Sequence, residues 1–140
     1  MLENTNRIYP TGSLSESGED YLEAILILGK NQPLVRVKDI ARFLGVSRPS
    51  VVVALGGLAA KGLVRHEHYG GVELTAKGRQ AADAVYQRHL LLEYFLNSIL
   101  GVSRRTARQD ACRLEHTLSP ESVRRLMNFV ARTKNYEKVK

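Results

Sequence analysis

Cysteine is scarce in this chain, since Cys112 is the single cysteine among 140 residues. One cysteine excludes an internal disulfide framework and is typical of a protein from a reducing compartment. Residues 1–4 lack the basic segment that precedes an apolar core in secretory signals, so we expect no such signal. Long apolar runs are also missing, because polar residues interrupt the richest apolar stretch, residues 90–100. These absences predict a soluble, cytoplasmic protein with no membrane partner.

Basic residues outnumber acidic ones, and 21 Lys and Arg against 14 Asp and Glu give a net charge of +7 and a pI near 9.8. Such a balance favours a polyanionic partner. The excess is local, because residues 36–79 hold eight Lys or Arg and three acidic residues, a net charge of +5. With 44% hydrophobic residues, the chain can bury a core in one domain or in two small ones.

The most specific local pattern lies within residues 37–62. A short amphipathic helix is predicted to end at Gly45, a residue that favours a left-handed C-cap. Ser47 can cap a second helix, and Pro49 is tolerated in the first turn of that helix. The second helix should end at Gly62. This arrangement is typical of a helix-turn-helix, with a plain helical hairpin as the alternative.

Two short strands are predicted next, over residues 63–67 and 72–74, around a glycine-containing turn. A hairpin directly after the second helix makes a winged helix. His68 and Tyr69 would then lie on the wing, either against DNA or as surface residues with no role.

Three candidate metal ligands occur close together. Cys112, Glu115 and His116 fall at i, i+3 and i+4 of a predicted helix and therefore project from one face. A thiolate, a carboxylate and an imidazole on one short arc can chelate a divalent transition metal. The plainer interpretation is a polar face with a small buried cysteine. Asp20 and Glu23 share a face of the first predicted helix, as ligands or as ordinary solvated carboxylates.

A long helix is predicted over residues 76–99, capped by Thr75. Its apolar stripe points His89 inward, where a lone histidine is more often a satisfied core residue than a ligand. Near its end this helix is apolar almost all round, which one small domain cannot easily bury. We therefore expect a homodimer. The expected interface residues are Leu91, Tyr94, Phe95 and Ile99.

Taken together, these features resemble the diphtheria-toxin-repressor family of metal-dependent transcriptional regulators. The resemblance rests on the winged helix, the long linking helix and the run Ala111-Cys112-Arg113-Leu114-Glu115-His116. The chain length and the run Asp20-Tyr21-Leu22-Glu23 are similar to the manganese-transport-regulator branch, the short form without an SH3-like domain. The resemblance covers residues 17–130.

The resemblance implies a metal site. The positions that match ligands of the manganese branch are Asp20, Glu23, His89, Cys112, Glu115 and His116. Cys112 departs from that branch, which has a carboxylate there, and agrees with the iron-responsive branch. Glu93 matches an ancillary ligand of the iron-responsive branch, but Arg108 stands where that branch has another histidine. We therefore expect Mn²⁺ or Fe²⁺ in a hybrid site, with Zn²⁺ or Co²⁺ binding in vitro.

The resemblance also implies DNA contacts. Family members often carry Gln, Lys or Thr on the exposed face of the second helix, whereas this chain has Val53, Gly56 and Gly57. Direct base readout therefore has few side-chain donors and acceptors here. The residues expected at the DNA are Arg36, Lys38, Ser47, Arg48, Pro49, Ser50, Val53, Lys61, Arg65, His68 and Tyr69.

We therefore expect a mainly α protein, with a winged helix-turn-helix DNA-binding domain over residues 1–75 and a helical dimerisation and metal-binding domain over residues 76–140. The expected function is a homodimeric, metal-dependent transcriptional repressor of metal-uptake genes that binds double-stranded operator DNA and no small organic substrate. A winged-helix regulator without a metal requirement is the alternative. A metallohydrolase is disfavoured because no HExxH-like helix is present, so we expect no catalytic residues and no enzyme.

Overall fold

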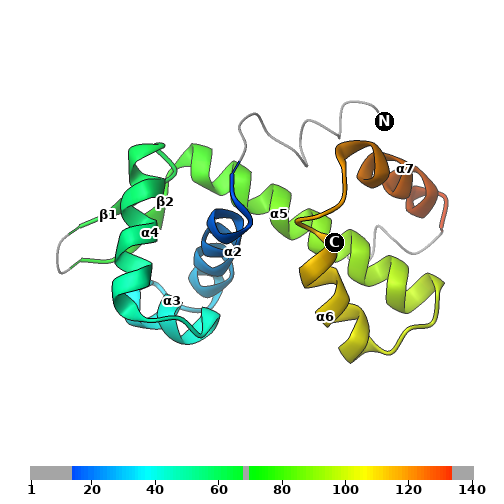
Figure 1. Cartoon of the computed structure of the whole chain (residues 1–140), viewed down its shortest axis with the longest axis horizontal. Helices are drawn as coiled ribbons and strands as arrows, with labels where there is room; N and C mark the ends of the chain where they lie inside the picture. The colour runs from blue at the N-terminus through cyan, green and yellow to red at the C-terminus, as the bar shows by residue number, and fades with distance from the viewer. Residues whose placement is uncertain (1–13, 68–69, 134–140) are drawn as a thin grey trace. The chain divides into compact units, whose positions relative to one another are not determined.

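The structure, a computed structural model, describes residues 14–67 and 70–133 (Figure 1). In this part of the chain, helices α2 to α7 account for most residues, together with one two-stranded sheet and one π-helical segment. The chain divides into two compact units, one of which spans Gly12–Asp83 and the other of which contains the chain from Ala84 onward. We call them the first and the second unit.

Helix α2 (Glu16–Asn31) opens the first unit. Ser15 caps it, because its Oγ accepts a hydrogen bond from the backbone N–H of Gly18 at 3.0 Å. Asp20 and Glu23 lie one turn apart on α2 and are both half-buried. The helix continues through Gly29 to Asn31.

Helices α3 (Val37–Leu44) and α4 (Arg48–Ala60) form the predicted helix-turn-helix (Figure 1). The turn between them depends on Gly45, whose φ of 68° is one that side-chain-bearing residues rarely adopt. Ser47 then caps α4, since its Oγ accepts from the backbone N–H of Ser50 at 3.2 Å. The axes of α3 and α4 differ in direction by 108°, an angle typical of the motif.

The core of the first unit is formed by the inner sides of α2, α3 and α4. Four of its larger side chains are completely buried: Leu22, Ile40, Val51 and Leu55. Burying a side chain of this size contributes about 1.5–3 kcal/mol, so these residues alone stabilise the three-helix arrangement substantially. Among the described residues of this unit, no charged residue is buried.

The wing follows α4 directly. Strand β1 (Val64–His66) pairs antiparallel with β2 (Val72–Leu74), with Val64 opposite Leu74. The backbone N–H of Val72 also donates to the carbonyl oxygen of Val35 at 2.7 Å, which attaches the hairpin to the segment before α3. The predicted winged helix is therefore present, and the fold is mainly α. His68 and Tyr69 lie outside the described residues.

Helix α5 (Ala76–Tyr94) begins in the first unit and ends in the second. Thr75 caps it as predicted, by accepting from the backbone N–H of Gly78 at 3.0 Å. A Cβ atom at Gly78 would collide with the carbonyl oxygen of Leu63, so glycine allows α5 to start directly against the wing. The first turn of α5 is thereby anchored to the wing.

The second unit contains the end of α5, the π-helical segment η2 (Phe95–Ile99), α6 (Arg104–Leu114) and α7 (Pro120–Ala131). Its apolar core joins α5 to α7. The fully buried members of this core are Leu91, Tyr94, Val123 and Val130.

Two predicted helix ends differ from the structure. The long helix loses α-helical hydrogen bonding at Phe95 and continues as η2 to Ile99. Helix α6 ends at Leu114, so Glu115 and His116 lie in the turn after it rather than on its surface. Within the described ranges no single helix is long and apolar enough to span a membrane, and α3 with α4 reaches that length and composition only as a bent pair.

Candidate metal centre and nucleic-acid interface

The second unit contains a cluster of ionisable side chains centred on His89. Its Nδ1 lies 3.0 Å from Oε2 of Glu115, and its Nε2 lies 3.0 Å from Oε2 of Glu93. Glu93 follows His89 by one turn of α5, whereas Glu115 reaches it from the turn after α6. The predicted inward orientation of His89 is confirmed, because the residue is only 8% exposed. It is held by two carboxylates rather than by apolar neighbours alone.

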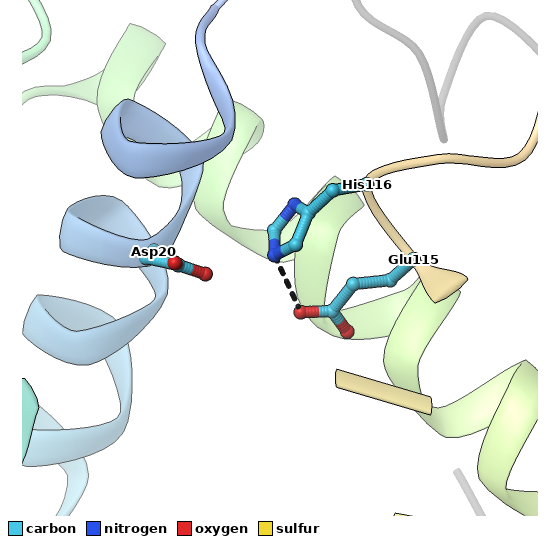
Figure 2. Close-up of side chains that lie close together, drawn as sticks. All are labelled: Asp20, Glu115 and His116. Carbon is cyan, nitrogen blue, oxygen red and sulfur yellow. Dashed lines mark ion pairs between the residues drawn. The ribbon is translucent and has the colours of Figure 1, made fainter. Parts of the chain in front are cut away.

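Two further donors meet the same cluster. The Sγ of Cys112 lies 3.7 Å from Nδ1 of His89, although Cys112 is otherwise exposed on α6. The Nε2 of His116 lies 3.2 Å from Oε1 of Glu115, the ion pair drawn in Figure 2. The two oxygens of Glu115 therefore each face a different histidine. The structure brings together four of the six predicted ligands: His89, Cys112, Glu115 and His116.

The charges in this cluster shift its pKa values. Burial by itself would lower the pKa of His89, but the hydrogen bonds to Cys112 and Glu115 and the charges of both groups raise it to about 10. Burial would raise the pKa of Glu115, but His116 and His89 outweigh that effect and lower it below its ordinary value. Without a metal, the cluster is therefore held together by a buried imidazolium and a buried carboxylate.

Arg88 is a buried residue that the sequence analysis did not single out. It is 2% exposed, and its Nε donates to the backbone carbonyl oxygen of Glu115 at 2.9 Å. Adjacent residues of α5 thus hold Glu115 at two points, with Arg88 at its backbone and His89 at its carboxylate. A sequence signal was present, because Arg88 follows the buried Val85 at i+3 and so interrupts the inward stripe of α5 with a charge.

The donor set fits a divalent transition metal. Two imidazoles, one buried carboxylate and a thiol are linked by pairwise contacts around His89 and Glu115, and each is a ligand that such ions accept. The contacts between His89, Glu115 and His116 are of the kind a cation can replace, since a neutral imidazole and an ionised carboxylate both offer lone pairs. Glu93 stands apart, because its Oε1 lies 3.7 Å from the guanidinium Nε of Arg108. Asp20 and Glu23, the remaining predicted ligands, belong to α2 of the first unit; Figure 2 labels Asp20 on that helix.

The predicted DNA-contacting residues of the first unit are on its surface. Every one that the structure describes is exposed: Arg36, Lys38, Ser47, Arg48, Pro49, Ser50, Val53, Lys61 and Arg65. Most project from the second helix of the motif or from the segments directly before and after it. The surface is therefore basic at its edges and, along α4 itself, largely apolar.

Comparison with known proteins decides the family. Residues 13–72 match the family model for the N-terminal DNA-binding domain of iron-dependent repressors, and residues 75–138 match the model for their metal-binding and dimerisation domain. The chain belongs to the iron-dependent repressor family. The boundary between the two matched regions lies close to the junction of the wing and α5.

Individual relatives agree with the family. The repressor is 41% identical over 105 residues to the transcriptional regulator MntR of Escherichia coli O6:H1, covering 75% of this chain and 67% of MntR. It is 35% identical over 123 residues to an uncharacterised HTH-type transcriptional regulator of Methanocaldococcus jannaschii, covering 87% of this chain and 98% of that protein. A solved manganese-dependent transcriptional repressor in complex with manganese superposes with a TM-score of 0.76 at 35% identity. That superposition covers 84% of this chain and 54% of the solved one, so the repressor spans about half its length.

These matches confirm the predicted family, the manganese-regulator resemblance and the function of a metal-dependent DNA-binding transcriptional repressor with a divalent transition metal as cofactor. They favour this function over the metal-independent alternative. The relatives are transcriptional regulators rather than enzymes.

The predicted dimer residues are less exposed than the sequence implied. Leu91 and Tyr94 pack against α7 of the same chain and are 1% and 8% exposed. Phe95 and Ile99 are half-buried, and the ring of Phe95 meets that of Phe129 edge to face at 6.2 Å between centroids. Part of the all-round apolar surface of the long helix is therefore covered within the repressor chain itself.

Proposed function

We propose that this chain is a homodimeric repressor of metal-uptake genes in the cytoplasm, which binds operator DNA when it holds Mn²⁺ or Fe²⁺ and has no enzymatic activity. One observation carries this proposal: the two carboxylate oxygens of the buried Glu115 each meet a different histidine, in the half of the chain that matches the metal-binding domain. A bound ion supplies positive charge that several of these side chains share. The manganese named for the solved relative favours Mn²⁺.

The proposed ligand set is the one that the family resemblance implies. It comprises Asp20, Glu23, His89, Cys112, Glu115 and His116. Asp20 and Glu23 belong to α2, which packs on the helix-turn-helix, whereas the other four belong to the second unit. Ligands drawn from both units would couple metal binding to the orientation of the recognition helices, since the DNA-competent arrangement must then bind metal more tightly.

Glu93 is proposed as an ancillary ligand rather than as a member of the main set. One of its oxygens faces His89 and the other faces Arg108, whose side chain is 65% exposed. The guanidinium of Arg108 stands where the iron-responsive branch has a histidine. We therefore propose that Glu93 orients His89 and accepts metal only as a weaker, second contact.

The domains are proposed to divide at residues 75 and 76. In the first, the exposed basic residues around α4 neutralise phosphates, and the wing, including His68 and Tyr69, lies along the adjacent backbone. In the second, we propose that Leu91, Tyr94, Phe95 and Ile99 form or support the dimer contact. The exposed side chains of Leu100 and Phe129, at 58% and 50%, extend the apolar surface near that contact.

Calorimetric titration of purified protein with Mn²⁺ tests the ligand assignment. His116→Ala and Asp20→Ala should each weaken binding, whereas Glu121→Ala removes an exposed carboxylate of α7 and should not. Cys112→Ser should weaken Zn²⁺ and Co²⁺ more than Mn²⁺, because thiolate prefers the softer ions. If Asp20→Ala binds Mn²⁺ as tightly as the wild type does, α2 contributes no ligand. If His116→Ala does so as well, the proposed site is wrong.

Dimerisation is tested separately by sedimentation. Phe95→Glu places a charge on the proposed contact and should yield monomers, because a buried unpaired charge is costly. A wild-type chain that sediments as a soluble monomer would contradict the proposed dimer.

A further inference from the structure

The recognition helix α4 has an unusual outward face. This face, formed by Pro49, Ser50, Val53, Gly56, Gly57 and Ala60, is exposed throughout. Val53 is 77% exposed, the highest value among the large exposed hydrophobic residues that the structure describes. The only side-chain polar group on the face is the hydroxyl of Ser50, which already lies 2.8 Å from the hydroxyl of Ser47.

An apolar face limits how DNA can be read. Adenine, guanine and cytosine are distinguished in the major groove by hydrogen-bond donors and acceptors, for which this face offers little. Thymine carries the one apolar mark in that groove, its C5 methyl group. A valine side chain that is exposed to water gains free energy when it contacts such a methyl group.

Two adjacent glycines point to close approach by a ligand. A Cβ atom at Gly56 or at Gly57 would meet nothing within 4 Å, and neither residue has a positive φ. Glycine in the middle of a helix is destabilising relative to alanine, so packing within the chain does not explain either residue. Because Gly56 and Gly57 carry no side chain, the axis of α4 can come nearer to the bases and backbone of a DNA groove.

The charges around α4 identify the occupant as DNA rather than a second copy of the chain. Arg48 starts the helix, Lys61 follows its end, Arg65 lies on the wing, and all three are exposed. The helix itself contains no acidic residue. Two copies of this surface would bring like charges together, whereas a polyanion complements them.

We propose that α4 recognises its operator chiefly through thymine methyl groups, with Val53 as the specificity-determining residue, so that the half-sites are rich in A·T pairs at the positions facing Val53. This inference rests on the proposed function, because it concerns the operator that the repressor binds. The inference assigns a preference for A·T pairs to a helix that lacks polar side chains for hydrogen bonding to base edges.

The test begins with selection of binding sequences from random double-stranded DNA by the full chain, once with Mn²⁺ and once with chelator. Each thymine of the enriched sequence is then replaced by uracil, which keeps base pairing and removes only the methyl group. At the positions facing Val53, this change should weaken wild-type binding about fourfold, the factor expected for burying one methyl-sized group. Val53→Ala should bind the thymine form as weakly as the wild type binds the uracil form, and should be insensitive to the replacement there. Val53→Thr, which keeps one methyl group, should retain part of the sensitivity.

Val52→Ala is the matched control, since it removes the same atoms from a neighbouring residue that is 49% exposed. It should leave the response to uracil unchanged. The inference is overturned if uracil is tolerated at every position, if no sequence is enriched in either selection, or if Val53→Ala changes sedimentation while DNA binding stays the same. Enrichment that is equal with Mn²⁺ and with chelator would contradict the proposed metal dependence alone, because the uracil response still tests Val53.

Discussion

The two units of the repressor differ in whether they bury or expose their charged side chains. In the described part of the chain, the buried basic and acidic residues are Arg88, His89 and Glu115, and all three belong to the second unit. The first unit buries an apolar core and keeps cations such as Arg48 and Arg65 in water. Burying a charge is costly unless it is paired, so the buried charges of the second unit depend on one another. The difference indicates that the DNA-binding unit is preformed, whereas the metal-binding unit is built to receive a cation.

The largest effect should come from removing the carboxylate at the centre of the cluster. Glu115→Ala leaves the imidazolium of His89 buried without one of its two carboxylate partners, which should lower the free energy of unfolding of the metal-free protein by about 3–5 kcal/mol. Urea unfolding followed by circular dichroism measures this change. Glu121→Ala removes an exposed carboxylate and should stay within about 0.5 kcal/mol of wild type. Equal losses for the two variants would remove the contrast between the units.

The second-largest effect should come from replacing Arg88. Arg88→Met keeps the length of the side chain but removes the donor to the carbonyl oxygen of Glu115, so the free energy of unfolding should fall by about 1–3 kcal/mol. Metal affinity should fall too, because the turn that carries Glu115 and His116 is no longer fixed to α5. Arg105→Met, an exposed change on α6, is the control for both measurements. Unchanged Mn²⁺ affinity in Arg88→Met would show that Arg88 only stabilises the fold.

The raised pKa of His89 predicts how metal binding depends on pH. With a pKa of about 10, His89 carries a proton at neutral pH in the metal-free protein, and a ligand histidine must lose it. Releasing one proton should make the apparent affinity for Mn²⁺ about tenfold tighter for each unit of rising pH. Calorimetry in buffers of different ionisation enthalpy counts the protons released.

The stability of the metal-free protein should change in the opposite direction. Since folding raises the pKa of His89 from 6.5 to about 10, its contribution to stability is complete below pH 6.5 and is lost as the pH rises towards 10. His89→Gln should remove the part of both dependences that comes from this one proton. Metal affinity that does not vary with pH would contradict the role of His89 as a ligand.

The smallest effect should have the opposite sign. Gly56→Ala and Gly57→Ala meet no steric obstacle in α4, so each should raise the free energy of unfolding by about 0.5–1 kcal/mol. DNA affinity should fall in the same variants if the glycines allow close approach to the groove. Thermal unfolding and DNA binding, measured on the same samples, separate the two effects. A variant that gains stability and keeps full DNA affinity would leave the glycines without a role in DNA binding.

Features determined by local chemistry were predictable from the sequence. The left-handed Gly45, the caps Ser47 and Thr75, and the two strands of the wing all lie where the sequence indicated. Each depends on residues a few positions apart, so the pattern alone carries the information. The convergence of His89, Glu115 and His116 was reached through family resemblance, because no local rule joins α5 to a turn 26 residues further along the chain.

Features determined by tertiary packing were only partly predictable from the sequence. Helix α6 ends at Leu114, although the apolar periodicity of the sequence continues past that residue. Beyond the helix end, Arg88 binds the backbone carbonyl oxygen of Glu115 and His89 binds its carboxylate. The apolar run before residue 100 was interpreted as dimer surface, yet Leu91 and Tyr94 already pack on α7. Amphipathic patterns indicate that a face is covered but not which partner covers it.

The most direct test of the central proposal is fluorescence anisotropy of labelled operator DNA with the wild-type protein, in Mn²⁺ and then in excess chelator. We expect tight binding with Mn²⁺ that falls by about 5- to 150-fold on chelation, the range of typical coupling free energies. The weak, salt-sensitive binding that remains should depend on Arg48 and Lys61 rather than on His116. Operator affinity that is the same with Mn²⁺ and with chelator would contradict a metal-dependent repressor.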